Sequence, residues 1–263
     1  LLTAARGVLL ARKDELARLV ASEQGKPVME ALVAEIMSGL SALTYYIHET
    51  PKLLADAPRR HRLPFLAHKH ARVEVHPRGV TSVLSPWNYP FAIPFCEIVA
   101  NLAAGNVVLL RPSTSTPLIA LALIDVFHAA GVPQDVLQVI TCRTREADPL
   151  VTDPRVRLLI FTGSTAVGRE LMGRASKTLC RTVLELGGKD PFIVFADAPL
   201  ERAARCAVWS AFMNAGQTCS STERVYVHRS VVERFTERVV ELTRALRVGD
   251  PLAPGTDVGP MTT

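Results

Sequence analysis

Hydrophobic positions follow two different spacings along the chain, and the change between them divides the sequence. Residues 3–49 place apolar side chains three and four positions apart, which predicts helices, with a break near Gly25-Lys26-Pro27. Residues 58–72 are basic and interrupted by proline, and the stretch that follows alternates polar and apolar residues as a strand does. Together these features predict an exposed hairpin arm at residues 58–80.

After the arm, short apolar runs alternate with helical segments. Runs such as NVVLL and VRLLIF consist largely of Val, Leu and Ile without polar alternation, and each precedes a helix-like stretch. Strands that are buried on both faces of a parallel sheet have this composition. We therefore predict an α/β fold with a Rossmann-like parallel sheet flanked by helices over residues 1–186. A second α/β unit begins near Gly187 and continues through residues 187–263.

Composition and charge narrow the class of protein. Hydrophobic residues at 48% and charged residues at 21% are typical of a globular protein. The net charge of +5 is scattered rather than concentrated in a basic stripe, so we expect no nucleic-acid partner. Five cysteines without regular spacing indicate a reducing compartment, and we expect a cytoplasmic protein. The longest uncharged run, residues 79–96, contains three prolines, so we expect no membrane association.

Four loops follow predicted strands, at the edge where open parallel sheets bind ligands. In the first, SPWNYP, prolines hold Asn88 in a rigid stretch, where its amide can donate to an oxyanion. The alternative is a proline-rich turn that packs Trp87 into the core. In the second, FTGSTAVG, Gly163 and Ser164 lead into a helix whose free amides suit a phosphate, although a simple serine cap has the same sequence.

The other two loops offer a carboxylate and a thiol. Glu185 closes an apolar strand and precedes Gly187-Gly188, so it is either a general base or an ordinary exposed glutamate. Cys219 lies in the small, polar stretch NAGQTCSST, where a thiol can meet a ligand. We interpret Cys219 as the only cysteine in an accessible loop with polar donors nearby. Cys142 is left open, and the remaining three are interpreted as inert filler: Cys96, Cys180 and Cys206.

Taken in order, the four loops resemble the aldehyde dehydrogenase superfamily over essentially the whole chain. The separation of 34 positions between Glu185 and Cys219 is similar to that between the base and the nucleophile of that family. The segments that carry the resemblance are PWNYP (86–90), FTGST.VG (161–168), LELGGK (184–189) and GQ.C (216–219).

The resemblance implies NAD- or NADP-dependent oxidation of an aldehyde to a carboxylic acid. Cys219 would form a thiohemiacetal and then a thioester, Asn88 would hold the oxyanion, and Glu185 would activate water. It also implies that residues 1–186 bind the dinucleotide and that residues 187–263 begin the catalytic domain, with no metal site. The implied cofactor contacts are Trp87, Gly163, Ser164 and Leu186.

Two departures from the family pattern bear on cofactor and substrate. Where the family usually has Lys-Pro-Ser-Glu at the adenosine ribose, this chain has Arg111, Pro112, Ser113 and Thr114, so we expect NADP to be tolerated as well as NAD. Members that act on succinate semialdehyde often carry an Arg-Lys pair where this chain has Cys96-Glu97. We therefore expect a neutral aliphatic or aromatic aldehyde. Five residues are expected either to line the tunnel through which the substrate enters or to belong to the hydrophobic core: Tyr89, Phe91, Ile93, Trp209 and Met213.

Alternatives to a hydrolytic dehydrogenase remain open at this point. One is an aldehyde dehydrogenase that transfers the acyl group to CoA, and another is a truncated, non-catalytic member that binds or assembles. The chain begins without Met and stops in mid-pattern, so we expect a piece of a longer protein. We interpret the arm histidines His68, His70 and His76 as solvated rather than metal-binding, and we expect a homo-oligomer, either a dimer or a tetramer.

Overall fold

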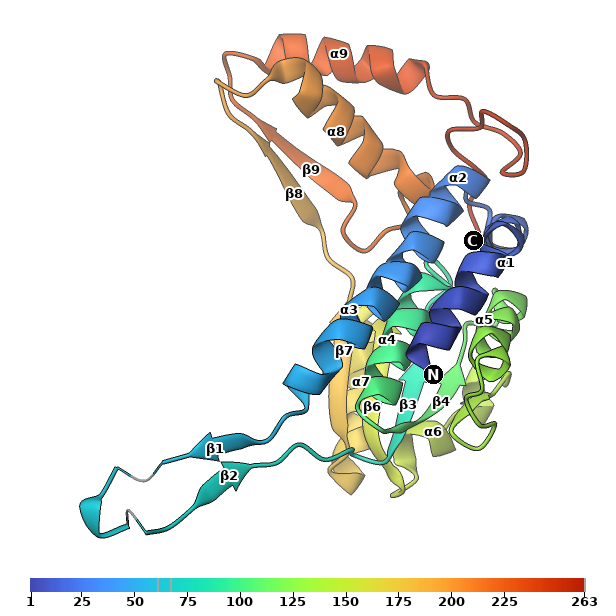
Figure 1. Cartoon of the computed structure of the whole chain (residues 1–263). Helices are drawn as coiled ribbons and strands as arrows, with labels where there is room; N and C mark the ends of the chain where they lie inside the picture. The colour runs from blue at the N-terminus through green and yellow to red at the C-terminus, as the bar shows by residue number, and fades with distance from the viewer. Residues whose placement is uncertain (61, 67, 263) are drawn as a thin grey trace.

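The computed structural model describes residues 1–60, 62–66 and 68–262, and it begins with the predicted helices (Figure 1). The first helix ends at Gly25, which adopts a left-handed φ of 103° and donates its N–H to the Ala21 carbonyl. Pro27 then starts a new helical run, so the predicted break near residues 25–27 is confirmed. The helical elements are α1 (Leu2–Gln24), α2 (Val28–Glu30), the π-helical turn η1 (Ala31–Ile36) and α3 (Met37–Leu53).

The run Val28–Leu53 is long and apolar enough, at 26 residues and a mean hydropathy of 1.2, to cross a membrane. Core helices pass the same test of length and composition. Here α3 packs against α1 and against α4 (Ala92–Ala103), and Leu43 of α3 is fully buried. The expectation of no membrane association, which rested on a different segment, stays a prediction.

A five-stranded parallel sheet forms the centre of the first part of the chain. Its strand order is β5-β4-β3-β6-β7, so the chain moves outward from β3 in one direction and then crosses back to add β6 and β7 on the other side. The predicted α/β parallel sheet is confirmed. The strands are β3 (Val80–Leu84), β4 (Val107–Arg111), β5 (Leu137–Val139), β6 (Val156–Gly163) and β7 (Arg181–Leu186).

Helices cover both faces of this sheet. On one face α1, α3, α4 and α5 (Pro117–Ala129) enclose the larger core, in which Phe95 stacks on Phe91 and on Phe127 with ring centroids 4.8 Å apart in each pair. On the other face α6 (Pro149–Thr152) and α7 (Thr165–Ala175) enclose a smaller core. Burial on both faces explains why the strands lack polar alternation.

The last part of the chain forms a separate layer with its own small core. Strands β8 and β9 pair in parallel, and α8 and α9 pack on each other and enclose Phe235. Figure 1 shows this layer at one end of the first sheet. The division into domains at residue 186 stays a prediction. The elements are β8 (Asp190–Val194), α8 (Leu200–Phe212), β9 (Thr222–Val227) and α9 (Val232–Arg244).

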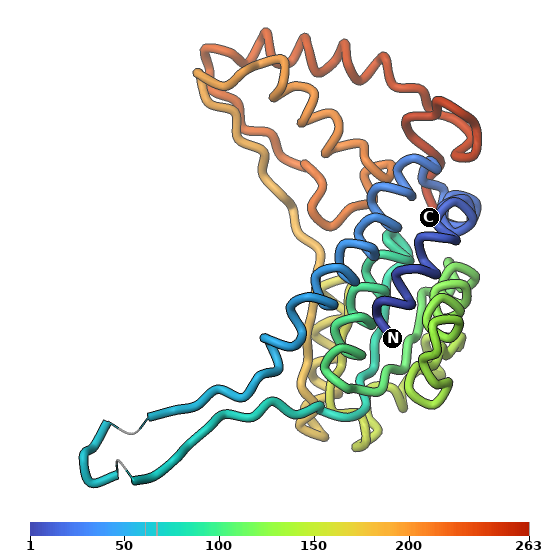
Figure 2. The backbone as a smooth tube through the Cα atoms, viewed as in Figure 1, coloured from blue at the N-terminus to red at the C-terminus, as the bar shows by residue number. Residues whose placement is uncertain are grey.

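A two-stranded ribbon projects from the body between α3 and β3 (Figure 2). Strands β1 (Ala57–Arg59) and β2 (Ala71–Val73) pair antiparallel, with Ala57 opposite Val73. His61 and Ala67, which belong to this predicted arm, lie outside the described residues. An isolated two-stranded hairpin has little stability of its own.

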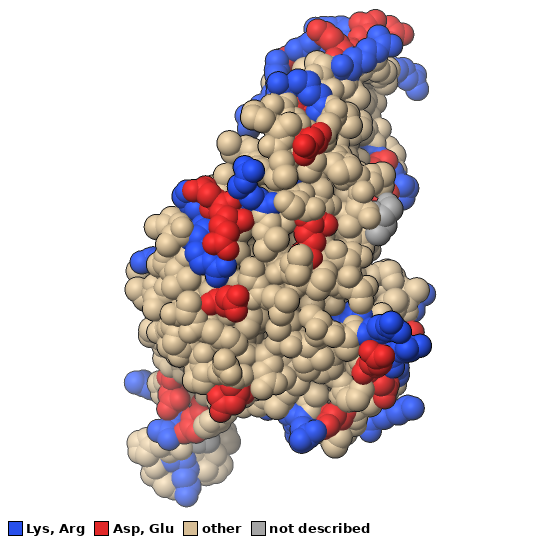
Figure 3. Space-filling model, turned by 90° about the vertical axis from the view of Figure 1, so that its right-hand side faces the viewer, with Lys and Arg blue, Asp and Glu red and all other residues tan. Residues whose placement is uncertain are grey.

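Charged side chains of both signs are interleaved on the face drawn in Figure 3. Basic residues stand next to acidic ones there, and a broad central area carries few charges. Paired examples from the whole molecule include Arg12 with Glu15 and Arg238 with Glu201. Interleaving of this kind agrees with the scattered charge of the sequence.

Candidate active site

The sheet reverses its strand order between β3 and β6, and the predicted site residues lie around the carboxyl ends of these strands. Asn88 follows β3, Ser164 follows β6, and Glu185 is the last residue but one of β7. Ligands of open parallel sheets bind at such a reversal, because the loops on its two sides lead away from each other and leave a crevice.

The Asn88 loop is joined directly to the Cys219 loop. The Asn88 Nδ2 atom donates to the Gln217 carbonyl at 2.9 Å, and the Tyr89 hydroxyl is hydrogen-bonded to the Thr218 hydroxyl at 2.8 Å. Cys219, the next residue, is exposed. An amide nitrogen carries two N–H donors, and the second one on Asn88 has no partner in the part of the chain that the structure describes. Burial raises the pKa of Tyr89 to about 12, so its hydroxyl keeps its proton.

A strained turn leads into the Cys219 loop. In η5 (Met213–Gly216), Asn214 and Ala215 both adopt a left-handed φ of 55°, which is costly for residues other than glycine. The buried Asn214 side chain fixes this turn by donating to the Asn88 carbonyl at 2.8 Å and accepting from the Gln24 amide at 2.9 Å. Asparagine tolerates the left-handed region better than most residues.

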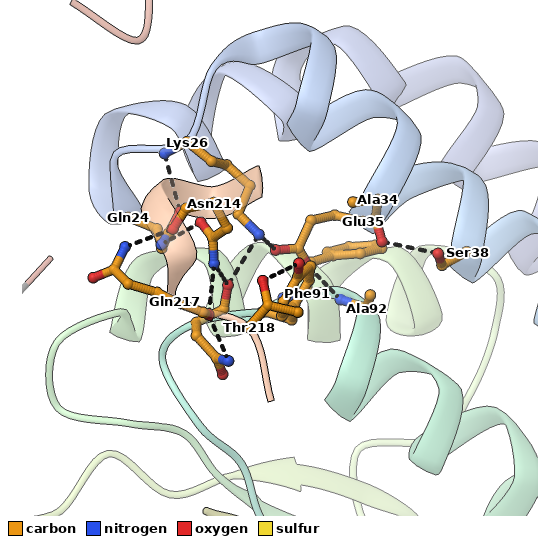
Figure 4. Close-up of polar contacts among 12 residues, drawn as sticks. Gln24, Lys26, Ala34, Glu35, Ser38, Phe91, Ala92, Asn214, Gln217 and Thr218 are labelled. Atoms are coloured by element: carbon orange, nitrogen blue, oxygen red, sulfur yellow. Dashed lines mark hydrogen bonds and ion pairs between the residues drawn. The ribbon is translucent and has the colours of Figure 1, made fainter. Parts of the chain in front are cut away.

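A buried ion pair supports the Asn88 loop from the helical side (Figure 4). The Lys26 Nζ atom lies 2.6 Å from Glu35 Oε1, donates to the Asn88 carbonyl at 2.9 Å, and sits 3.8 Å from the centre of the Tyr89 ring. Both charged side chains are fully buried. The second oxygen of Glu35 accepts from the backbone N–H groups of Phe91 and Ala92 at 3.1 and 2.6 Å, respectively.

This ion pair was not predicted as part of the site. The only local signals are a lysine at a helix break and an acid within a largely apolar helical stretch, Glu35. Asn88, by contrast, was predicted from its proline-rich loop. Its backbone carbonyl accepts from both Lys26 and Asn214, so two elements distant in sequence orient the residue.

Glu185 lies at the same edge of the sheet but outside these contacts. Its side chain is exposed, and among the described residues no hydrogen bond or ion pair joins it to the Cys219 loop. The structure thus brings Asn88 and the Cys219 loop into contact and places Glu185 near the end of β7, which β6 separates from β3. The catalytic roles of all three stay predictions.

On the cofactor side, the FTGS loop has features of both predicted alternatives, a serine helix cap and a phosphate site. Ser164 caps α7, since its hydroxyl accepts from the Val167 N–H at 3.4 Å, and the helix begins at Thr165 with first-turn amides that have no intrahelical acceptor. A Cβ atom on Gly163 would lie 2.5 Å from the tip of the Phe161 ring, so that ring would have to move to admit a larger residue. A Cβ atom on Gly187, by contrast, would meet nothing within 4 Å. Trp87 and Leu186 are half-buried at the same edge.

The predicted ribose contacts begin at the end of β4. Arg111 donates through Nη2 to the Cys142 carbonyl at 3.3 Å and to the Thr144 hydroxyl at 3.0 Å, while its Nε atom is shielded from solvent without a partner in the described chain. The Ser113 hydroxyl accepts from the Ser115 N–H at 3.2 Å, and Thr114 is exposed. Arg111 is therefore partly engaged by the neighbouring loop.

The structure corrects the interpretation of one cysteine and decides between the alternatives for one aromatic residue. Cys206 is exposed on α8, so accessibility does not single out Cys219 among the cysteines as we predicted. The interpretation failed because Cys206 occupies a helix position that points away from the small core. For Phe91 the structure favours the core alternative, because its side chain is fully buried and stacks on Phe95.

Two hollows in the surface lie away from these residues. One, of about 210 Å³, is lined by Arg78, Arg157 and Arg181 among others, and another, of about 270 Å³, lies against Pro149 and Arg155. Both contain residues from the amino-terminal ends of the strands. They are therefore at the opposite edge of the sheet from Asn88 and Cys219.

The strand ends of this open parallel sheet carry a loop cysteine, an amide and a carboxylate. This arrangement is typical of α/β enzymes that bind a nucleotide at the edge of the sheet. The model of the aldehyde dehydrogenase family matches residues 1–263. The chain belongs to this family, and the predicted resemblance is confirmed.

Similar proteins are known from sequence. The chain is 40% identical over 255 residues to succinate-semialdehyde dehydrogenase [NADP(+)] of Escherichia coli, covering 97% of this chain and 52% of that protein. It is 39% identical over 255 residues to 3-sulfolactaldehyde dehydrogenase of Pseudomonas putida, covering 97% of this chain and 51% of that protein. The chain thus spans about half the length of the curated relatives it matches.

Solved structures share the fold. An aldehyde dehydrogenase of Brucella melitensis biovar abortus 2308 superposes with a TM-score of 0.95 at 38% identity, over 100% of this chain and 53% of that one. A 3,6-anhydro-L-galactose dehydrogenase in complex with NAP superposes with a TM-score of 0.92 at 33% identity, over 100% of this chain and 54% of that one.

Proposed function

We propose that the protein containing this chain oxidises an aldehyde to a carboxylic acid with NAD or NADP. The observation that supports the proposal is the hydrogen bond from the Asn88 amide to the Gln217 carbonyl, because it joins the residue we assign as oxyanion donor to the loop that carries Cys219. Membership of the aldehyde dehydrogenase family supports the reaction type.

In the first step the exposed Cys219 thiol loses its proton to solvent water, and the thiolate sulfur bonds to the aldehyde carbon while the carbonyl π bond breaks, which makes a thiohemiacetal with a negatively charged oxygen. The free N–H of the Asn88 amide and the backbone N–H of Cys219 are the donors we assign to that oxygen. A donor fixed before the reaction stabilises the developing charge without reorganisation, and Lys26 and Asn214 provide that fixation through the Asn88 carbonyl.

The residues of the first sheet fit a dinucleotide. The first-turn amides of α7 suit a pyrophosphate, and the space beside Gly187 allows a flat ring to approach the backbone. A nicotinamide held at this edge of the sheet would supply a hydride acceptor for the thiohemiacetal carbon. Relatives named for NADP support the expectation that NADP is accepted, and Arg111 at the end of β4 is the cation we assign to the adenosine side.

The last step is hydrolysis of the thioester on Cys219. A water oxygen bonds to the acyl carbon, its proton passes to Glu185, and the carbon–sulfur bond breaks with the electron pair left on sulfur. Glu185 lies at the carboxyl end of β7, beside the loop of Gly187 and Gly188, which supports a role next to the acyl group. A base for water in this position favours hydrolysis over transfer to CoA.

We further propose a neutral aldehyde as substrate. The relatives are named for aldehydes that carry an acidic group, and this chain has no cation at positions 96 and 97. Cys96 directs its sulfur to the Ser38 carbonyl at 3.9 Å, and Glu97 is hydrogen-bonded to Thr162. An acidic substrate would meet a carboxyl group there instead of a positive partner.

A panel of aldehydes tests both substrate and cofactor. With the protein as encoded, including any sequence beyond residue 263, we expect kcat/KM for butanal and benzaldehyde to exceed that for succinate semialdehyde by at least about tenfold, the scale of one lost charge contact. Both NAD and NADP are expected to support turnover. A preference for succinate semialdehyde would contradict the neutral substrate, and strict exclusion of NADP would contradict the cofactor proposal.

The homo-oligomer and the cytoplasmic location stay predictions. The exposed β1–β2 ribbon supports a partner subunit, because Phe65 and Val73 are 71% and 49% exposed on an element with little stability of its own.

A further inference from the structure

Glu97 is the only charged residue of α4, whose sequence is AIPFCEIVANLA. The rest of this helix is mostly apolar and packs against α3 and the sheet. Instead of turning to solvent, the Glu97 carboxyl group reaches the end of β6, where the Thr162 hydroxyl donates to its Oε1 atom at 3.2 Å. The other oxygen, Oε2, is shielded from solvent and has no hydrogen-bond partner among the described residues.

The neighbour of Thr162 across the sheet is Glu185. The two residues are register partners in the parallel strands β6 and β7. Register partners project their side chains from the same face of a sheet, and neighbouring strands are about 4.8 Å apart. Glu97 therefore approaches the same patch of the sheet as Glu185, with Thr162 between them.

Glu185 is the charged group that acts on the Glu97 carboxyl group, and the polar contact of that carboxyl group is with Thr162. The titratable groups that face Glu97 are Glu185 from β7 and Cys96 from its own helix. Beyond Cys96 lie Glu35 of η1 and Tyr46 of α3.

These surroundings decide the charge of Glu97. Burial is the main reason that its pKa is raised to about 8, the negative charge of Glu185 adds to the shift, and the Thr162 hydrogen bond opposes it. At neutral pH Glu97 is therefore mostly protonated.

We propose that Glu97 is a positioning residue for thioester hydrolysis: it holds one proton beside Glu185, so that the two carboxyl groups share a single negative charge and Glu185 is the member that takes the proton from water. This inference rests on the proposed function. In the step itself the water oxygen bonds to the acyl carbon, one water proton moves to Glu185, and the Cys219 sulfur leaves with the bonding electrons. Glu97 keeps its own proton throughout, because burial favours its neutral form.

A dependence on pH follows from this arrangement. As the pH rises through about 8, Glu97 loses its proton, and a second negative charge makes Glu185 a stronger proton acceptor. Deacylation is therefore expected to rise by about threefold between pH 7 and pH 9.5, beyond the rise seen without this carboxyl group. Glu97→Gln keeps the shape and removes the titration, so this extra rise should disappear.

Hydrolysis of 4-nitrophenyl acetate isolates the step, because this ester acylates the cysteine without hydride transfer. The initial burst of nitrophenolate reports Cys219, and the steady rate that follows reports deacylation. We expect a burst in the wild type, in Glu97→Gln and in the control Glu237→Gln, whose glutamate is exposed on α9. The alkaline rise should persist in Glu237→Gln and be absent from Glu97→Gln. In a Glu185→Gln background, Glu97→Gln should change nothing.

A second variant keeps the test independent of how well Glu97→Gln folds. Thr162→Val removes the hydrogen bond that favours ionised Glu97, so the alkaline rise should move to higher pH. An unchanged rise in Glu97→Gln, or an unshifted rise in Thr162→Val, would overturn the role of Glu97. A missing burst in the wild type, or a burst that survives Cys219→Ser, would overturn the proposed function instead.

Discussion

Replacing Cys219 with serine is expected to lower aldehyde-dependent reduction of NAD or NADP by about 10⁴-fold or more. A serine hydroxyl is not ionised near neutral pH, and among the described residues the hydrogen bonds of the neighbouring Thr218 go to a hydroxyl and a carbonyl rather than to a base. The rate of formation of the reduced cofactor measures the loss directly.

The matched control is Cys206→Ser. Cys206 is also exposed and free, but it lies on α8, away from the loop joined to Asn88. We expect this variant to keep the wild-type rate. Equal losses in the two variants would show that the effect is general to thiol replacement, and a fully active Cys219→Ser protein would contradict the assigned nucleophile.

Replacing Lys26 with methionine is expected to lower the free energy of unfolding by about 3–5 kcal/mol. The change leaves Glu35 as a buried charge without its partner and removes one of the two side-chain donors to the Asn88 carbonyl. Urea unfolding, followed by circular dichroism, measures the change in stability. The rate of aldehyde oxidation should fall as well, because Asn88 is less firmly oriented.

An exposed ion pair provides the comparison. Lys189 lies 2.7 Å from Glu223 with both side chains largely in solvent, so Lys189→Met should leave the urea midpoint unchanged. Adding Glu35→Leu to Lys26→Met should not restore stability, since the N–H groups of Phe91 and Ala92 then lose their acceptor. A Lys26→Met protein as stable as the wild type would contradict this account of the ion pair.

Much of the fold follows from local sequence signals. β6 was predicted because VRLLIF is apolar without alternation, and such a strand is stable only when both of its faces are covered. The end of α1 was predicted from Gly25, which adopts the left-handed conformation expected at a helix end. The positions of Asn88 and Ser164 just after strands also followed from the alternation of elements.

The contacts that orient these residues were not predictable in the same way. Lys26 and the Asn88 carbonyl are 62 positions apart in sequence, and Gln24 and Asn214 are 190 apart. Residue type and local spacing carry no information about which distant groups meet once the helices pack. The exposure of Cys206 was missed for the same reason, because it depends on which face of α8 meets the small core.

Glu97 illustrates how burial changes the meaning of a residue. In the sequence, Glu97 lies where members that act on succinate semialdehyde often have part of an Arg-Lys pair. It was used there only to predict that the substrate is neutral. In the structure its carboxyl group is turned onto the sheet beside Glu185, and its raised pKa follows from that position. The proposed proton transfer to Glu185 at the end of β7 thus depends on Glu97, a residue of α4 that lies outside the four loop motifs.

The most direct test of the account is to trap the acyl group on the enzyme. We expect Glu185→Gln, mixed with a neutral aldehyde and NAD or NADP and then acid-quenched, to accumulate a protein heavier by the mass of the aldehyde less two hydrogens. Peptide mass spectrometry should place this adduct on Cys219. An adduct on another cysteine, or cofactor reduction without any adduct, would contradict the claim that Cys219 carries the thioester and Glu185 releases it.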